Sequence, residues 1–334
     1  MPKRVLGDRY ELDRRLGRGG MAEVWRGIDR VLARRVAVKT FSLADAADPA
    51  LSDMVNREAI ATAALEHPDI VTVHDAGVDG DTAYIVMERL RGRDLAAVLS
   101  DGPLPLTEAL RIASRVAGAL AAAHAAGIVH RDVKPANILI DEDRVMVVDF
   151  GIAAFEYQPV TSLAEEGTTH GTAEYMAPEQ ARAESATRST DMYSFGCLLT
   201  ALVAGRPPFT GARPEAILHQ HVFIDPPRLA QLSPGVPEAL DVLVSTLLAK
   251  DPDGRPSAET VVEVLTEVAA QLTGEAAGAA PGSGWPGSVG VSFDAPTAAP
   301  EVITASADAL TAAADAITAA ADAITAATET HRTP

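Results

Sequence analysis

Two short segments bring together residue types that could carry out one kind of chemistry. The first is His130-Arg131-Asp132-Val133-Lys134-Pro135-Ala136-Asn137, and the second is Asp149-Phe150-Gly151. Phosphoryl transfer needs such a set, because one carboxylate accepts the proton of an attacking hydroxyl while another carboxylate and an amide oxygen hold Mg²⁺ on the phosphates. The alternative is a turn between two buried strands with solvated acids. That alternative explains less, because both segments are complete, ordered and joined by a plausible hairpin.

Composition limits the kind of protein that can hold these segments. A chain of 334 residues suggests roughly two domains, and an apolar fraction of 47% is ample for a large core. The net charge is −18, of which the tail after Gln271 carries −6. Since nucleic acids bind basic surfaces, such acidity argues against a nucleic-acid partner. The single cysteine, Cys197, cannot form an internal disulfide, which fits a cytoplasmic location.

No segment of the sequence predicts a membrane span. Residues 1–15 are charged and lack the apolar core of a signal peptide. The uncharged runs 116–130 and 192–205 are too short to cross a bilayer and are interpreted as core helices. The longer run 276–293 is rich in Gly, Pro and Ser. We therefore expect a soluble protein.

The first part of the chain predicts a glycine-containing loop between strands. Residues 9–41 alternate apolar and polar positions, which indicates two strands joined by residues 16–24 and a third strand at 36–39. Glycines in such a loop let backbone N–H groups approach phosphate oxygens closely. A plain hairpin is the alternative. No Gly-Lys-Ser/Thr follows, so a Walker A loop is excluded.

The elements that must position the chemical residues follow in order. A helix is predicted over 49–66 and ends at His67-Pro68. Strands are predicted at 70–73 and 83–87, and a hinge at 88–92. A helix over 107–126 contains His124, which is more simply a hydrogen-bonded core histidine than a catalytic group. Strands at 138–140 and 145–148 form the hairpin between the two chemical segments, and an apolar helix begins at Asp191.

Two stretches have no regular pattern of buried positions. Residues 151–172 form a long segment of little periodicity, which a compact domain keeps only for function. Residues 273–300 are interpreted as a flexible linker. A seven-residue, alanine-rich repeat follows at 301–334, and Ile303, Leu310, Ile317 and Ile324 fall on one stripe. We expect a weak self-association or partner helix there, although a helix that frays in water is an equal alternative.

Residues 9–271 resemble bacterial serine/threonine protein kinases of the eukaryotic-like type. The resemblance rests on four motifs: H-R-D-x-x-x-x-N, Asp149-Phe150-Gly151, Val36-Ala37-Val38-Lys39, and Ala177-Pro178-Glu179 at the end of the segment that begins at Gly151. It implies an α+β, bilobal fold, with a small antiparallel-sheet N-lobe at 1–88 and a mainly helical C-lobe at 89–272. Many relatives carry a membrane helix and an outer sensor domain, which we do not expect in this chain.

The resemblance implies a role for each chemical residue. ATP and Mg²⁺ are the implied cofactors, with Asn137 and Asp149 as metal ligands. Asp132 is the implied base that accepts the substrate hydroxyl proton, and Lys134 stabilises the transferred group. Lys39 contacts the phosphates and is oriented by an ion pair with Glu58.

The implied nucleotide pocket combines loop glycines, apolar walls and the hinge backbone. Ala22 stands where the family has its third glycine, which leaves the loop geometry there in doubt. Val148 is a further implied wall. The implied pocket residues are Leu16, Gly17, Gly19, Gly20, Ala22, Val24, Ala37, Lys39, Met87, Glu88, Leu90 and Leu139.

The resemblance also implies structural and regulatory contacts. Asp191 is expected to brace the backbone of the catalytic loop, and Glu179 to pair with Arg255. Residues 151–179 resemble the activation segment of this family, and Arg131 pairs, in related kinases, with a phosphate on that segment. Here the available hydroxyls are Thr161, Ser162, Thr168 and Thr169, and Glu165 and Glu166 could supply built-in charge or be merely solvated.

The implied activity is transfer of the ATP γ-phosphate to protein Ser or Thr hydroxyls, with autophosphorylation. Lys134 favours Ser/Thr over Tyr substrates by resemblance. A pseudokinase scaffold is one alternative, but no phosphate or metal group is missing. A small-molecule phosphotransferase is another, and the segment from Gly171 to Glu179, which resembles a peptide-binding segment, argues against it.

Overall fold

The computed structural model describes residues 4–18, 22–43, 59–60, 62–150 and 170–278. By its contacts the chain divides into residues 1–280 and 281–334, and only the first unit contains described residues. The boundaries given above for linker and tail therefore stay predictions. Among the helices described, none is both long and apolar enough to cross a membrane.

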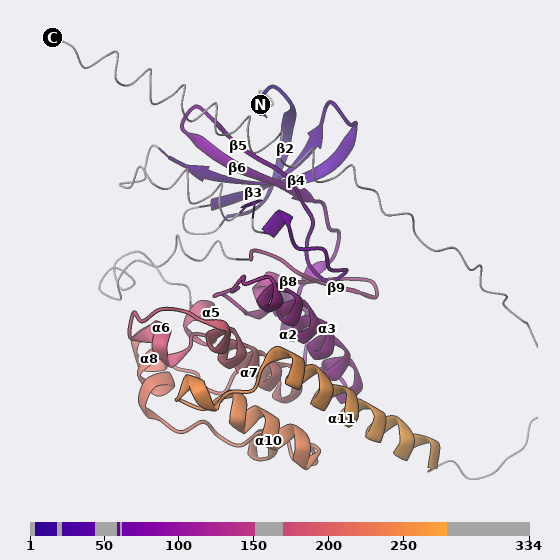
Figure 1. Ribbon diagram of the computed structural model, residues 1–334, viewed down its shortest axis with the longest axis vertical. Helices are drawn as coiled ribbons and strands as arrows, with labels where there is room; N and C mark the ends of the chain where they lie inside the picture. Colours follow the sequence, from indigo (N-terminus) through magenta and orange to yellow (C-terminus); the bar gives the residue numbers. More distant parts are fainter. Residues whose placement is uncertain (1–3, 19–21, 44–58, 61, 151–169, 279–334) are drawn as a thin grey trace, which may run out of the picture. The chain divides into compact units, whose positions relative to one another are not determined.

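A six-stranded antiparallel sheet forms the first lobe (Figure 1). Its spatial order is β1-β2-β3-β4-β6-β5. Alternating side chains bury both faces, with Val36, Val38 and Tyr84 in the cluster on one face and Ala37, Phe41 and Met87 in the cluster on the other. The strands are β1 (Arg4–Leu6), β2 (Tyr10–Arg18), β3 (Ala22–Asp29), β4 (Arg34–Ser42), β5 (Val73–Asp79) and β6 (Thr82–Glu88).

One strand differs from the sequence-based prediction. The prediction of a strand at 70–73 is wrong. Ile70 makes only an isolated bridge to Val147, and the strand β5 runs from Val73 to Asp79. Its residues include His74, Asp75 and Gly77, so the apolar pattern is weak and pairing with β6 determines the strand. The short strand β1 was not predicted. Of the helix expected at 49–66, only Ala59, Ile60, Thr62 and Ala63 are described as helical.

A small second sheet joins the first lobe to the helices. It contains β7 (Arg93–Asp94), β8 (Ile138–Asp141) and β9 (Arg144–Val147), in that order. The backbone N–H of Val147 donates to the carbonyl of Asp69 at 2.8 Å, and that of Val71 donates to the carbonyl of Val147 at 3.1 Å. The predicted hairpin is thus confirmed, and its second strand is tied to the segment before β5.

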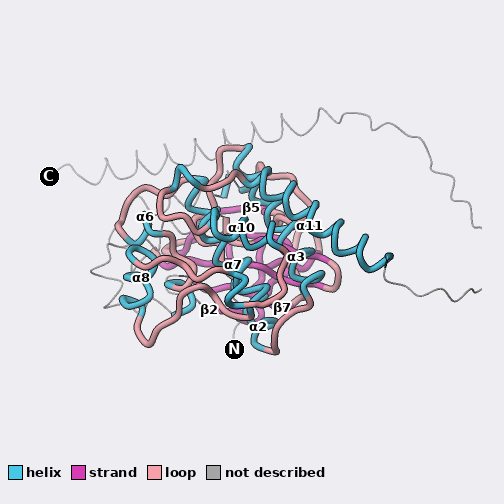
Figure 2. Tube along the Cα trace, turned by 90° about the horizontal axis from the view of Figure 1, so that it is seen from below, coloured by secondary structure: helices cyan, strands magenta, loops and turns pink. Residues whose placement is uncertain are grey.

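The second lobe is helical and packs around two long helices. In α3 (Leu106–Ala125) the residues Ala109, Ala113, Val116 and Leu120 are buried at helical spacing. Helix α7 (Arg188–Ala204) is buried on almost every side, as expected for an apolar helix at the centre of a core. Helix α11 (Ala258–Gly278) lies along α3 (Figures 1 and 2).

The remaining helices are short. The 3₁₀ turns are Pro135–Asn137 and Pro252–Gly254. The other helices are α2 (Leu95–Ser100), α5 (His170–Ala173), α6 (Pro178–Ala181), α8 (Pro214–Phe223), α9 (Leu229–Leu232) and α10 (Glu238–Leu247). Of these, α9 and α10 pack against α7.

Gly92 lets the hinge run directly against strand β8. A Cβ at Gly92 would lie 1.8 Å from the carbonyl oxygen of Ile140 and 2.4 Å from its carbonyl carbon. No side-chain rotation relieves a clash with backbone. We expect Gly92→Ala to lower the free energy of unfolding by about 1–3 kcal/mol, the usual cost of overpacking.

Urea unfolding of the variant and its parent measures this effect. Gly118→Ala is the matched control, because a Cβ there meets nothing closer than the His67 ring at 3.9 Å. This helical substitution should be neutral or stabilising. Equal midpoints for Gly92→Ala and the parent would show that the hinge relaxes freely.

Candidate active site

The backbone of the catalytic loop is held in a costly conformation. Arg131 has φ +70° and Asp149 has φ +62°, values that non-glycine residues adopt at a cost. The carboxylate of Asp191 accepts from the backbone N–H of His130 at 2.8 Å and of Arg131 at 2.7 Å. The Gln180 amide donates to the carbonyl of Arg131 at 2.8 Å. The expectation that Asp191 braces this loop is confirmed.

His124 belongs to the same buried network. Its Nε2 lies 2.7 Å from Oδ2 of Asp191, and its side chain is almost completely buried. The expectation of a hydrogen-bonded core histidine is confirmed. Asp191 is itself fully buried, so its three polar contacts replace the water that it loses.

Replacing Asp191 with asparagine tests the brace. The amide keeps the size of the carboxylate but offers one acceptor where two N–H donors need acceptors. We expect a loss of about 1–3 kcal/mol in stability and a fall in kcat with KM for ATP nearly unchanged, since the loop carries Asp132.

The control is Thr200→Val on the same helix, which removes only the bond from Thr200 to the carbonyl of Gly196. Steady-state kinetics and urea unfolding measure both variants. An unchanged kcat for Asp191→Asn would assign Asp191 to stability alone.

Asp132 lies among a lysine, an amide and a hydroxyl. Its Oδ2 is 2.7 Å from Nζ of Lys134 and accepts from Nδ2 of Asn137 at 2.8 Å. Nζ of Lys134 also donates to Oγ1 of Thr172 at 3.0 Å. Oδ1 of Asp132 has no partner among the described residues. This free oxygen is the one able to accept a proton from a substrate hydroxyl.

The second segment is joined to the first through His130. Nε2 of His130 contacts the carbonyl of Val148 at 3.1 Å, and the His130 ring lies 4.6 Å from the Phe150 ring, centroid to centroid. Asp149 follows Val148, and its Oδ1 is 3.1 Å from Nζ of Lys39. The structure therefore brings Lys39 from β4 to the loop after β9.

The donor set fits Mg²⁺ bound together with phosphates. Nδ2 of Asn137 donates to both the carbonyl and the carboxylate of Asp132, which leaves its amide oxygen as an acceptor. The carbonyl of Asn137 accepts from the N–H of Val148 at 3.0 Å, beside Asp149. One carboxylate and one amide suit an ion that keeps waters and phosphate oxygens as further ligands. Among the described residues, no three or more His, Cys, Asp or Glu side chains form a group that could hold a metal ion.

Most predicted pocket walls fall into one apolar cluster. Ala37 and Met87 are buried there, and Ala22, Val24, Leu90 and Val148 pack against them. Leu16 is 50% exposed, and neither it nor Leu139 belongs to that cluster. At the hinge, the N–H of Glu88 donates to the carbonyl of Thr72 at 2.9 Å, and its side chain pairs with Arg144 at 3.1 Å.

Several predicted residues lie outside the described residues. These are Gly19 and Gly20 of the glycine loop, Glu58 with its expected ion pair to Lys39, and the hydroxyls and acids of the activation segment, Thr161, Ser162, Glu165, Glu166, Thr168 and Thr169. Gly17 lies in β2, and a Cβ added there would meet no atom within 4 Å.

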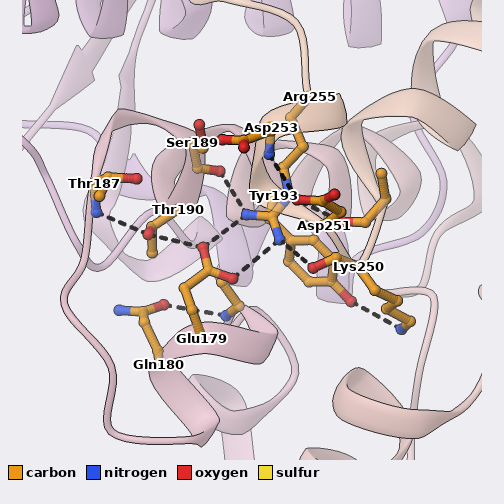
Figure 3. Close-up of polar contacts among 12 residues, drawn as sticks. Glu179, Gln180, Thr187, Ser189, Thr190, Tyr193, Lys250, Asp251, Asp253 and Arg255 are labelled. Atoms are coloured by element: carbon orange, nitrogen blue, oxygen red, sulfur yellow. Dashed lines mark hydrogen bonds and ion pairs between the residues drawn. The ribbon is translucent and has the colours of Figure 1, made fainter.

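A buried ion pair anchors the end of the activation segment (Figure 3). Nη1 of Arg255 is 2.7 Å from Oε1 of Glu179, and Nη2 is 3.0 Å from Oε2. Thr190 donates to Oε1 of Glu179 at 2.8 Å. Burial raises the pKa of Glu179, but the bond and charge of Arg255, a backbone N–H and the Thr190 hydroxyl together lower it more, so the pKa lies below its usual range. The expected Glu179–Arg255 pair is confirmed.

Sequence reasoning missed two contacts at the site. Gln180 fixes the carbonyl of Arg131, and Thr172 contacts Lys134. The only sequence signal for Gln180 was its position directly after Glu179. Thr172 stood at the end of the aperiodic segment, but nothing in the sequence linked it to Lys134.

Known proteins resemble this chain in sequence. The protein kinase domain family matches residues 10–265. The chain is 43% identical over 261 residues to a probable serine/threonine-protein kinase PknB of Corynebacterium glutamicum, covering 75% of this chain and 40% of that protein. It is also 43% identical over 256 residues to serine/threonine-protein kinase PknB of Mycobacterium leprae, covering 75% and 41%.

A solved structure extends the similarity to the fold. The crystal structure of the M. tuberculosis PknI kinase domain superimposes with a TM-score of 0.64 at 31% identity, and the match covers 81% of this chain and 99% of that one. The expected α+β fold of a sheet lobe and a helical lobe is confirmed. This chain spans about two fifths of the length of the curated relatives it matches. On the family match and the geometry together, the chain belongs to the protein kinase domain family.

Proposed function

We propose that this chain is an ATP- and Mg²⁺-dependent serine/threonine protein kinase. The observation that carries the proposal is the group of Asp132, Lys134 and Thr172, joined by contacts of 2.7 Å and 3.0 Å, with one oxygen of Asp132 free of partners among the described residues. The names of the relatives from Corynebacterium and Mycobacterium support the same substrate class.

Each residue then has a task set by its contacts. When bound, Mg²⁺ and ATP supply the transferable phosphoryl group and neutralise its charge. Asp132 accepts the proton of the substrate hydroxyl at its free oxygen, and Lys134 offsets negative charge at the same place. Asn137 and Asp149 would hold the metal, and Lys39 lies beside Asp149 to contact the phosphates. Ala37, Met87 and Leu90 would enclose the adenine.

The roles rest on proximity and chemistry, and phosphate transfer tests them. The purified chain is incubated with radiolabelled ATP and Mg²⁺, with a Ser/Thr-containing protein in one arm and a small alcohol in the other. We expect label on protein, including the chain itself by autophosphorylation. Label only on the alcohol would favour a small-molecule phosphotransferase, and no transfer at all would favour a pseudokinase scaffold.

We also propose that residues 301–334 mediate weak association, with this chain or with a partner helix. Support comes from the stripe of Ile303, Leu310, Ile317 and Ile324. One large apolar residue in seven makes a narrow contact, so the affinity should be low. Deleting 301–334 should leave phosphate transfer intact and reduce association. Sedimentation giving the same mass with and without the tail would exclude self-association.

Two further proposals rest on the sequence. The lobes are assigned to 1–88 and 89–272, with a linker at 273–300. A cytoplasmic location is supported by the single cysteine, Cys197, which is buried. Fractionation of the native cells with a membrane-protein control measures the location.

A further inference from the structure

A cleft of about 210 Å³ lies where the sheet meets the hinge, and it is lined by three arginines. Arg26 lies on β3, Arg35 on β4, and Arg89 follows β6. Antiparallel partners share a face, so the pairings Arg26↔Ala37 and Ile28↔Arg35 place these side chains on the sheet face that carries Ala37. The full lining is Asp13, Arg26, Gly27, Ile28, Arg35 and Arg89.

The cleft and the apolar nucleotide pocket have no lining residue in common. The pocket cluster contains Ala37, Met87 and Leu90, and none of these lines the cleft. Arg89 lies between Met87 and Leu90 in sequence. Arg26 and Arg35 share the sheet face of Ala37, so the cleft continues along that face from the pocket cluster toward the hinge.

Positive charge in the cleft is only partly neutralised. Asp13 is the single acid of the lining, and it already accepts bidentate bonds from Arg26 at 2.7 Å and 2.7 Å. Among the described residues, the side chains of Arg35 and Arg89 have no hydrogen bond or ion pair. The nearby arginines Arg15 and Arg30, by contrast, are paired with Glu23 and Glu11.

Arg89 is partly desolvated and is repelled by the arginines around it. Burial lowers the pKa of Arg89, and the positive charges of Arg35, Arg26 and Arg91 lower it further. Arginine stays protonated even so. The protein therefore bears a repulsion that a bound anion would relieve, in a chain whose net charge is −18.

We propose that this cleft is a binding site for a phosphate-class dianion. Guanidinium groups match phosphate with paired N–H donors. The two uncompensated positive charges of Arg35 and Arg89 match the two negative charges of such a dianion. A volume of about 210 Å³ accommodates one compact group of this kind. Two sources share this chemistry: a phosphorylated side chain of a protein segment, and free inorganic phosphate.

Arginine side-chain NMR on the full-length chain locates the binding. The Nε–Hε signals of Arg26, Arg35 and Arg89 are followed while inorganic phosphate is added at constant ionic strength. A second titration uses a phosphothreonine peptide, with its unphosphorylated form beside it. We expect saturable shifts of these signals with phosphate and with the phosphopeptide only.

Substitutions in the cleft identify the groups that bind. Arg35→Gln and Arg89→Gln should each raise the Kd about tenfold or more, because each removes charge-assisted hydrogen bonds. Arg206→Gln is the matched control, an exposed arginine of the helical lobe, and should leave the Kd unchanged. Circular dichroism confirms that each variant is folded.

The outcomes separate the sources and the null result. A phosphopeptide Kd well below that of inorganic phosphate assigns the site to phosphorylated protein segments, and equal values assign it to free phosphate; both support the site. Shifts that never saturate, that chloride reproduces, or that Arg35→Gln/Arg89→Gln leaves unchanged would overturn it. Phosphate transfer by the same samples is independent of this result.

Discussion

Asp132→Asn is expected to lower kcat by about 10²–10⁴-fold, the usual contribution of a positioned base. The amide keeps the shape of the carboxylate and can still contact Lys134 and Asn137. It cannot take up a proton at the position where Oδ1 now lies free among the described residues. Since the residues proposed to contact ATP are unchanged in this variant, its KM for ATP should change little.

Asp143→Asn is the control for this substitution. Asp143 is an exposed acid in the turn between β8 and β9, close in sequence to the same loops. It should transfer phosphate at the parent rate. Steady-state transfer to a Ser/Thr protein substrate measures both variants. Near-parent turnover by Asp132→Asn would remove Asp132 from the role of base.

Much of this site was predictable because its residues are close in sequence. Asp132 and Lys134 directly precede the 3₁₀ turn that contains Asn137, and the hairpin β8–β9 returns the chain to Asp149. Fixed spacing on a tight turn constrains where these side chains can be. The helix α3 was likewise predictable, since its buried positions recur at helical spacing.

Contacts between distant segments were not predictable in the same way. Gln180 reaches Arg131 across 49 positions, and the clash that Gly92 avoids involves the backbone of Ile140. No local pattern records such tertiary contacts. The strand β5 was misplaced for a related reason, because its polar residues pair through backbone groups, which side-chain periodicity does not report. The arginine cleft combines β2, β3, β4 and the hinge, with no shared motif.

The Glu179–Arg255 pair should dominate the stability of the helical lobe. The Arg255 side chain is completely buried and also donates to the carbonyls of Ala249, Ser189 and Lys250 at 2.8, 2.9 and 3.1 Å. Its guanidinium lies 4.8 Å from the centre of the Tyr193 ring. Arg255→Met would leave the Glu179 carboxylate buried without a cation. Removing one partner of a buried pair costs about 3–5 kcal/mol.

The exposed pair Arg93–Asp101 provides the matched control. Arg93→Met makes the same chemical change at side chains that are 56% and 65% exposed, where solvent screens the charges. Urea unfolding should show a large loss for Arg255→Met and little change for Arg93→Met. Equal losses would mean that burial of the pair does not matter.

The pH dependence of the loss identifies its cause. In the parent, the lowered pKa of Glu179 contributes stability that is present above the unfolded value of about 4.3 and is lost as pH falls through the folded pKa. In Arg255→Met the charge and bond of Arg255 are gone, and burial, which is the largest cause, is opposed only by the smaller effects of a backbone N–H and Thr190, so the pKa of Glu179 rises. The variant then gains stability, relative to the parent, as pH falls from about 7 toward about 5. The difference in free energy of unfolding between the parent and Arg255→Met should therefore become smaller over that range. The double variant Glu179→Gln/Arg255→Met lacks the carboxylate, so its difference from the parent should not shrink. A difference between the parent and Arg255→Met that stays constant with pH would show that lost packing, and not the stranded carboxylate, causes the destabilisation.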